Sequence, residues 1–302
     1  MNPRPTKDKA ASVRQRLLNL ARSGQRPFNE LLQYYAMERF LYRLSRSVHA
    51  ERFILKGALM LRVWDAPQAR PTMDIDLLGR TSNEVGAMVA QIREILATEV
   101  DADGLVFAPD TIQAERITED ADYEGVRIRF LANLDTARIT MQVDVGFGDI
   151  VFPAPLLSAF PTLLDDPAPR LLGYSRESAI AEKFEALVKL GEINSRMKDY
   201  YDIWMLSRQF DFRSDLLAEA IRRTLTHRGT ELPEEIAGLG DRFAATKQTQ
   251  WSAFRRRLQQ EHVPDAFSEI VDSLRKFLTP ALPPKSGAIL PALQWTAPGP
   301  WQ

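Results

Sequence analysis

Residues 53–78 decide the fold, and they read FILKGALMLRVWDAPQARPTMDIDLL. The stretch opens with a short apolar strand and continues into a helical segment, which two prolines end because proline breaks a helix. It closes with a second strand at residues 73–78, in which Asp74 and Asp76 alternate with apolar residues. Side chains two positions apart on a strand project from the same face, so we expect these two carboxylates to converge.

A third carboxylate lies in a similar setting. Asp144 interrupts the apolar run MQVDVGFG at residues 141–148. If its strand neighbours that of Asp74, three carboxylates meet at one place, and such a set can hold divalent cations against a triphosphate. Alternating aspartates alone also occur on solvent-facing strand edges. Gly57 supports the interpretation as a triphosphate site, because a small residue between a strand and a helix lets backbone N–H groups approach a phosphate.

The composition limits the possible chemistry. The 302 residues include no cysteine, which excludes disulfides, cysteine-based zinc sites and thiol nucleophiles. The three histidines, His49, His227 and His262, show no ligand spacing, so any metal is expected to be a hard ion held by carboxylates. No apolar run reaches the roughly 18 residues that span a membrane, and the polar N-terminus is unlike a signal peptide. We therefore expect a cytoplasmic protein with no membrane partner.

The net charge of −1 conceals an uneven distribution. Residues 1–48 contain ten Lys/Arg and three Asp/Glu, a balance of +7, whereas residues 49–150 contain ten and eighteen, a balance of −8. A basic segment is often only the solvated face of a helix. Its alternative is an electrostatic surface for a polyanion or an acidic partner.

The periodicity predicts the remaining elements. Asp135-Thr136 forms a suitable short connection for a hairpin between strands 126–134 and 137–146. Helices are expected at 10–24, 29–48, 82–97, 176–190, 196–209, 214–228, 240–261 and 266–278. Sheet-forming segments followed by helices indicate an α+β fold.

The same pattern predicts the domain organisation. The expected parts are a basic helical segment at 1–48, an α/β core at 49–152, a proline-rich connector at 153–175, a helical domain at 176–278 and a proline-rich tail at 279–302. The tail is expected either to be poorly ordered or to wrap the surface through Trp295 and Trp301.

The helical half carries a second group of charged residues. Lys183 borders the apolar stripe of its predicted helix, so it needs an anionic partner unless its ammonium reaches water. Asp199 and Asp202 are neighbours on one side of the next helix, and Lys198 is spaced to pair with Asp202. The residues alone therefore indicate an internal salt bridge.

The motifs also carry a family resemblance. Gly57-Ala58 followed by Asp74-Ile75-Asp76 resembles the opening motif of the nucleotidyltransferase β-polymerase superfamily. More narrowly, residues 53–77, with EKFEALV at 182–188 and KDYYDI at 198–203, resemble the AbiEii/AbiGii toxin family, which includes the MenT nucleotidyltransferase toxins. The resemblance implies an N-terminal nucleotidyltransferase-type mixed sheet flanked by helices, followed by a C-terminal helical domain.

The resemblance also implies roles for the candidate residues. The metal ligands would be Asp74, Asp76 and Asp144, holding Mg²⁺ or Mn²⁺, and Lys183 and Asp202 would join them as catalytic residues. The NTP substrate would be bound by Lys56, Gly57, Ala58, Lys183 and Asp199. Ala58 departs from the Gly or Ser usual in the family and donates no hydroxyl, so phosphate binding there would use backbone N–H groups.

The implied reaction is transfer of NMP from an NTP to an RNA acceptor, the 3′ end of tRNA, which would block translation. An AbiEi-like antitoxin is the implied protein partner. Two other interpretations stay open at this point. One is a nucleotidyltransferase acting on a small molecule or a protein hydroxyl. The other is a non-catalytic binding module with a structural acidic cluster.

Overall fold

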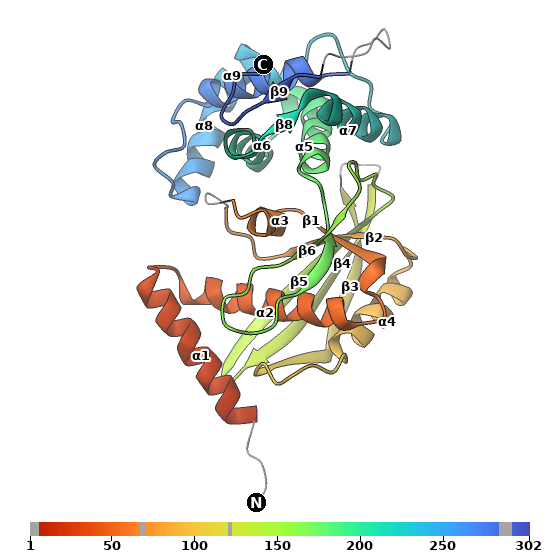
Figure 1. Ribbon diagram of the computed structural model, residues 1–302, viewed down its shortest axis with the longest axis vertical. Helices are drawn as coiled ribbons and strands as arrows, with labels where there is room; N and C mark the ends of the chain where they lie inside the picture. Colours follow the sequence, from red (N-terminus) through yellow and green to blue (C-terminus); the bar gives the residue numbers. More distant parts are fainter. Residues whose placement is uncertain (1–5, 67–69, 120–122, 284–291) are drawn as a thin grey trace, which may run out of the picture. The chain divides into compact units, whose positions relative to one another are not determined.

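The computed structural model describes residues 6–66, 70–119, 123–283 and 292–302. The chain forms two compact units, and Figure 1 shows the elements of each. The first unit comprises Met1–Gly148 and Leu156–Gly173, and the second comprises Asp149–Pro155 and Tyr174–Gln302. No helix in the described ranges is long and apolar enough to cross a bilayer.

The first unit is built on a seven-stranded mixed sheet with the order β3-β4-β5-β2-β1-β7-β6. Its strands are β1 (Phe53–Lys56), β2 (Ile75–Gly79), β3 (Leu105–Glu119), β4 (Tyr123–Leu134), β5 (Ala137–Phe147), β6 (Leu156–Ala159) and β7 (Arg170–Gly173). Its helices are α1 (Thr6–Ser23), α2 (Phe28–Arg46), α3 (Leu59–Val63) and α4 (Val85–Leu96). β2 pairs with β5 in parallel and with β1 antiparallel. The mixed sheet with flanking helices confirms the predicted α+β class.

Alternation along the strands separates a buried face of the sheet from a polar one. On β5, Met141 and Val143 are fully buried and pack on the side covered by α2, whereas Gln142 and Asp144 project from the other side. The rings of Phe40 on α2 and Phe130 on β4 lie 5.6 Å apart on the covered side. Burial of apolar side chains under the helices thus directs the alternate, charged residues to the opposite face.

The proline-rich stretch at 153–175 differs from the extended connector that its composition predicts. It contributes β6 and β7 to the edge of the sheet, where β7 pairs with β1 in parallel. The prolines flank these two strands and occupy no position within them, so the ladder hydrogen bonds remain possible.

The second unit is helical. It contains α5 (Arg176–Leu190), α6 (Met197–Gln209), α7 (Ser214–His227), α8 (Asp241–Leu258) and α9 (Phe267–Leu278), with a small ribbon of β8 (Phe212–Arg213) and β9 (Gln294–Trp295). Its core includes the rings of Tyr200, Phe243, Trp251 and Phe267, which pack in stacked and edge-to-face pairs. Such aromatic packing supplies much of the buried apolar area of a helical unit.

The described part of the C-terminal tail packs on this unit. The Trp295 and Trp301 rings lie 4.9 and 5.7 Å from that of Phe277, and the Trp301 indole N–H donates to the Phe277 carbonyl. This agrees with a tail that wraps the surface through its tryptophans. Residues 284–291, which the same expectation covers, lie outside the described residues.

Candidate active site

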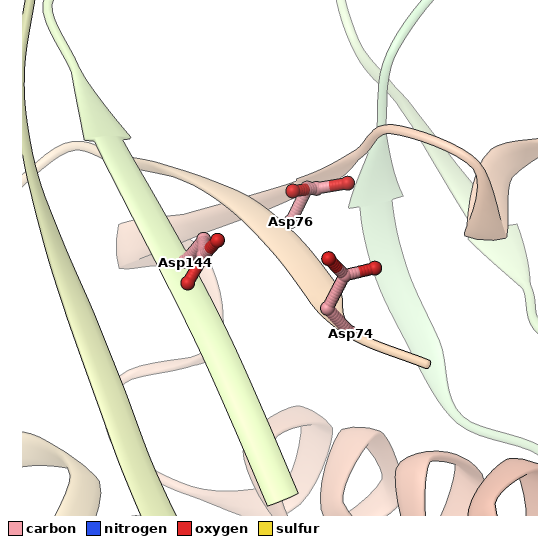
Figure 2. A group of neighbouring side chains, drawn as sticks. All are labelled: Asp74, Asp76 and Asp144. Atoms are coloured by element: carbon pink, nitrogen blue, oxygen red, sulfur yellow. The ribbon is translucent and has the colours of Figure 1, made fainter. Parts of the chain in front are cut away.

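Three carboxylates meet on the polar face of the first unit. The parallel pairing of β2 with β5 sets Asp76 directly beside Asp144, and Asp74 lies two positions before Asp76, directly before β2 begins. One oxygen from each of Asp74, Asp76 and Asp144 lies within 4.8 Å of the other two. Figure 2 shows the three side chains grouped together at these two neighbouring strands. The convergence expected from the sequence is therefore present in the structure.

Strand register extends this group into a row of charges across four strands. Lys56 on β1 is paired with Asp76, Asp76 with Asp144, and Asp144 with Arg127 on β4. Residues directly opposite one another share a face of the sheet. The order of charges is therefore cation, two anions, cation, so that two basic side chains flank the adjacent carboxylates.

Arg127 holds Asp144 in a bidentate ion pair. Its Nε donates to Asp144 Oδ1 at 2.9 Å and its second guanidinium nitrogen to Oδ2 at 2.7 Å, while Gln142 also donates to Oδ2 at 3.2 Å. The hydrogen bond to Asp144 raises the pKa of Arg127 above its usual value, with Glu115 and Asp74 adding to the effect. Asp144 is 8% exposed, so its charge requires this partner.

Arg127 is a site residue that the sequence reasoning missed. The signal was available, because the predicted hairpin turn at Asp135-Thr136 places position 127 opposite position 144. Counting back equally from both sides of the turn would have found the pair.

The position of Asp74 is fixed by groups from distant parts of the chain. Thr72 donates its hydroxyl to Asp74, and its backbone N–H donates to the Tyr34 hydroxyl at 3.1 Å. Gln33, also on α2, donates to the carbonyls of Met73 and Thr140 at 3.0 and 3.1 Å. One buried amide therefore ties the residue before Asp74 to β5. No local pattern predicts these contacts, which join α2 to segments 40 and 107 residues away.

Gly57 lies against the carboxylate group, between β1 and α3. Its φ is +70°, and a Cβ atom at this position would overlap the Asp76 carboxylate. Only glycine meets both conditions at low cost. Ala58 follows as the residue that caps the N-terminal end of α3 and is 5% exposed. The predicted small-residue junction is thus in direct contact with Asp76, where backbone can approach a bound phosphate.

The donor set fits a hard divalent cation. Carboxylate oxygens are the ligands that Mg²⁺ and Mn²⁺ prefer, and three of them converge here without a thiolate or imidazole among them. Each carboxylate oxygen has two lone pairs, so Asp144 can accept from Arg127 and still face a cation. Within the described residues, this is the group of acidic side chains that meets the distance condition for a metal site.

The second predicted group lies in the second unit. Lys183 on α5 forms ion pairs with Asp199 at 3.0 Å and with Asp202 at 2.8 Å, both on α6. Arg196 adds a contact of 2.6 Å to Asp199. Burial raises the pKa of Asp199, but Lys183 and Arg196 outweigh it and hold that pKa below its usual value. The sequence spacing suggested Lys198 as the partner of Asp202, whereas in the structure Asp202 pairs with Lys183 from the neighbouring helix.

The basic segment at the N-terminus is partly neutralised within its own unit. Arg16 pairs with Asp165 at 2.6 Å, and Lys9 lies 3.8 Å from Asp166. The Arg14 guanidinium lies over the Phe28 ring, whereas Arg22 is exposed in the last turn of α1. The +7 balance of residues 1–48 therefore overstates the free charge that this segment presents.

Comparison with known proteins places this chain in a family. The chain matches the model of the nucleotidyl transferase AbiEii toxin family, type IV toxin–antitoxin system, over residues 39–273. Among solved structures it is similar to MenT4, a nucleotidyltransferase toxin of Mycobacterium tuberculosis, with 17% identity, a TM-score of 0.46 and coverage of 88% of this chain and 98% of that one. It is also similar to a putative nucleotidyltransferase of Helicobacter pylori, with 11% identity, a TM-score of 0.44 and coverage of 82% and 95%.

No curated protein matches the chain. The family model spans most of the sequence, including the carboxylate group and the Lys183 cluster. It confirms the resemblance seen in the motifs, and the chain belongs to the AbiEii family of nucleotidyltransferase toxins.

Proposed function

We propose that this nucleotidyltransferase transfers NMP from an NTP to the 3′ end of tRNA in a reaction that depends on Mg²⁺ or Mn²⁺, and so blocks translation. The observation that carries the proposal is the convergence of Asp74, Asp76 and Asp144 beside Gly57. In the reaction, the acceptor hydroxyl oxygen forms a bond to the α-phosphorus. The bond from that phosphorus to the bridging oxygen breaks, and pyrophosphate leaves.

The chain's own residues would divide the work. Asp74, Asp76 and Asp144 would hold the cation, which supplies charge stabilisation at the attacking and leaving oxygens when bound. Backbone N–H groups at Gly57 and Ala58, with Lys56, would contact the phosphates. Asp144 would accept the proton of the attacking hydroxyl, and Arg127 would keep its carboxylate oriented.

Lys183 would neutralise phosphate charge, oriented by Asp199 and Asp202. Two buried carboxylates hold the Lys183 ammonium in a fixed position. This arrangement supports a cation positioned to contact phosphate, and it also stabilises the second unit. Lys183→Met together with Asp202→Asn, which avoids leaving both carboxylates uncompensated, should raise the KM for NTP. An unchanged KM in a folded variant would remove Lys183 from nucleotide binding.

A labelled-transfer assay tests the main proposal. The wild type is incubated with total tRNA, each of the four labelled NTPs, and Mg²⁺ or Mn²⁺. Label should move to tRNA, and Asp76→Asn should abolish the transfer. The matched control is Asp101→Asn, an exposed aspartate of the same unit, which should retain full activity.

The assay also separates the alternatives. Label on a protein or a small molecule would overturn the tRNA acceptor while leaving the transferase chemistry in place. No label from any NTP, with either cation, would overturn the proposed reaction itself. Translation in an extract should stop only when transfer to tRNA occurs, and an AbiEi-like antitoxin is proposed as the partner that counters this effect in the cell.

A further inference from the structure

The first unit contains a pocket of about 370 Å³ between the start of α2 and the end of α3. Arg26, Glu30, Tyr34, Arg62 and Asp65 line it, together with Pro71 and Pro161. Its volume falls within the range typical of small-ligand sites, roughly 300–1,000 Å³. Two guanidinium groups, one aromatic ring and two carboxylates thus face a common space.

Arg62 is the group in this pocket with an unpaired buried donor. Its guanidinium carbon lies 4.4 Å from the centroid of the Tyr34 ring, and its Nε is buried without a hydrogen-bond partner. Within the part of the chain that the structure describes, Arg62 forms no ion pair. The ring face offsets part of the charge, but a guanidinium carries five N–H donors that an aromatic ring does not satisfy.

The backbone holds Arg62 in a fixed position. Ala66 N–H donates to the Leu61 carbonyl and Asp65 N–H to the Arg62 carbonyl, while Asp65 has a φ of +55°. These bonds and the left-handed residue form a Schellman motif that ends α3, with aspartate where glycine is usual. The backbone of Arg62 is therefore fixed at the end of α3.

Arg26 contributes a second guanidinium over the same ring. Its central carbon lies 5.5 Å from the Tyr34 centroid, and it pairs with Glu30 at 2.6 Å. Because Glu30 is engaged by Arg26, Arg62 keeps its charge for a ligand. Asp65 supplies a carboxylate at the rim that can accept from a hydroxyl group.

The pocket is connected to the carboxylate group by two hydrogen bonds. Tyr34, which forms its wall, accepts from the Thr72 N–H at 3.1 Å, and Thr72 donates its hydroxyl to Asp74. A ligand resting on Arg62 and Tyr34 therefore lies close to the residues proposed to hold the cation.

We propose that this pocket binds the phosphate and ribose of a nucleotide, with Arg62 and Arg26 on the phosphate and Asp65 on a ribose hydroxyl. The planar guanidinium of arginine matches the oxygens of a phosphate, and Pro71 and Pro161 offer apolar surface to the sugar. The identification as a nucleotide subsite rests on the proposed function. The phosphate can come from the RNA acceptor or from the NTP, and the experiment distinguishes these sources.

The test measures binding without turnover. Wild type, Arg62→Met and Arg26→Met are titrated with two probes: a fluorescein-labelled single-stranded oligoribonucleotide, and a fluorescent α,β-methylene NTP analogue with Mn²⁺. The Arg26 side chain is 36% exposed, so that variant tests the pocket even where Arg62→Met does not fold. Arg46→Met, on an exposed residue in the last turn of α2, is the matched control.

If the acceptor occupies the pocket, Arg62→Met should weaken oligoribonucleotide binding about tenfold and reduce its salt slope by about 0.7, with the analogue unaffected. If the NTP occupies it, the analogue should weaken by a similar factor instead. If Arg62→Met and Arg26→Met bind both probes as tightly as Arg46→Met does, the proposal that this pocket binds a nucleotide is wrong. Because no turnover is measured, that failure is separate from failure of transfer, which Asp76→Asn reports.

Discussion

At the scale of single residues, the site depends on a few positions where geometry leaves little choice. Gly57 has positive φ and lies against Asp76, and Arg127 engages both oxygens of Asp144. The three carboxylates are within 4.8 Å of one another, so like charges repel unless cations flank them. Changes at these positions should therefore disturb the arrangement of the three carboxylates.

Replacing Gly57 by alanine should lower transfer at least about tenfold, because the new Cβ would displace the Asp76 carboxylate and strain the backbone. The measurement is the rate of label transfer beside the melting temperature. Gly86→Ala on α4 is the control, since a Cβ there meets nothing within 4 Å and alanine favours helix. Equal activity of the two variants would contradict the role assigned to Gly57.

Replacing Arg127 by methionine should lower kcat by roughly 10–100-fold, as expected for loss of a group that orients a metal ligand. Mn²⁺ binding, followed by electron paramagnetic resonance, should not weaken, because removing a cation makes the carboxylates more attractive to the metal. Arg127→Lys should fall between, since lysine keeps the charge but lacks the fork. Arg138→Met, an exposed arginine on β5, is the control; if it lowered kcat as much as Arg127→Met, the positioning role would be wrong.

At the scale of elements, buried ion pairs join segments that are distant in sequence. In the second unit, Arg228, directly after α7, contacts Asp149 at 2.9 Å and Glu185 on α5 at 2.9 Å. The two carboxylate side chains are only 2% and 3% exposed. Arg228 therefore ties the segment 149–155 to the helices that follow it.

Arg228→Met should lower the free energy of unfolding by about 3–5 kcal/mol, because it leaves two buried carboxylates without their cation. Urea unfolding followed by tryptophan fluorescence reports mainly on this unit, which holds four of the five tryptophans. Arg222→Met on α7 removes an exposed pair with Glu219 and should cost less than about 1 kcal/mol. If Arg228→Met lost no more free energy of unfolding than Arg222→Met, the stabilising role assigned to Arg228 would be wrong.

At the scale of the whole molecule, pH should change stability through Glu38. Burial raises the pKa of Glu38 to about 7, although Arg39 lies 2.8 Å away and the Leu163 N–H donates to Oε2 at 2.7 Å. Its Oε1 has no hydrogen bond, so the ion pair with Arg39 is poorly aligned and burial prevails. Asp166 nearby raises the pKa further.

The folded state therefore binds this proton more tightly than the unfolded chain. The stabilisation is complete below the ordinary glutamate pKa and is lost as pH rises toward 7. Glu38→Gln keeps an oxygen that can accept from the Leu163 N–H. As pH rises from 4.5 to 8, its free energy of unfolding should increase by roughly 3 kcal/mol relative to that of the wild type. Urea unfolding of both proteins across this range measures the difference. A difference that stays constant with pH would show that Glu38 keeps its ordinary pKa.

Much of the fold could be predicted from the sequence, because apolar periodicity marks strands and helices wherever one face is buried. The β6 and β7 strands were missed because five prolines over residues 153–169 suggested a connector, although none lies within the strands. Asp144 lies beside Asp76 because β2 and β5 are neighbouring strands. The sequence alone did not show which strands are neighbours, so it predicted the three-carboxylate group only if these two strands pair.

By itself, the sequence determined which residue types are available for chemistry. With no cysteine and three scattered histidines, it left carboxylates as the candidate metal ligands, and the alternation of Asp74 and Asp76 put both on one face. Only the tertiary structure decided the groups around them. Arg127 depends on strand register, Gln33 and Tyr34 on the docking of α2, and the Arg62 pocket on the meeting of α2 with α3. These contacts join residues far apart in the chain, and local periodicity carries no information about such distances.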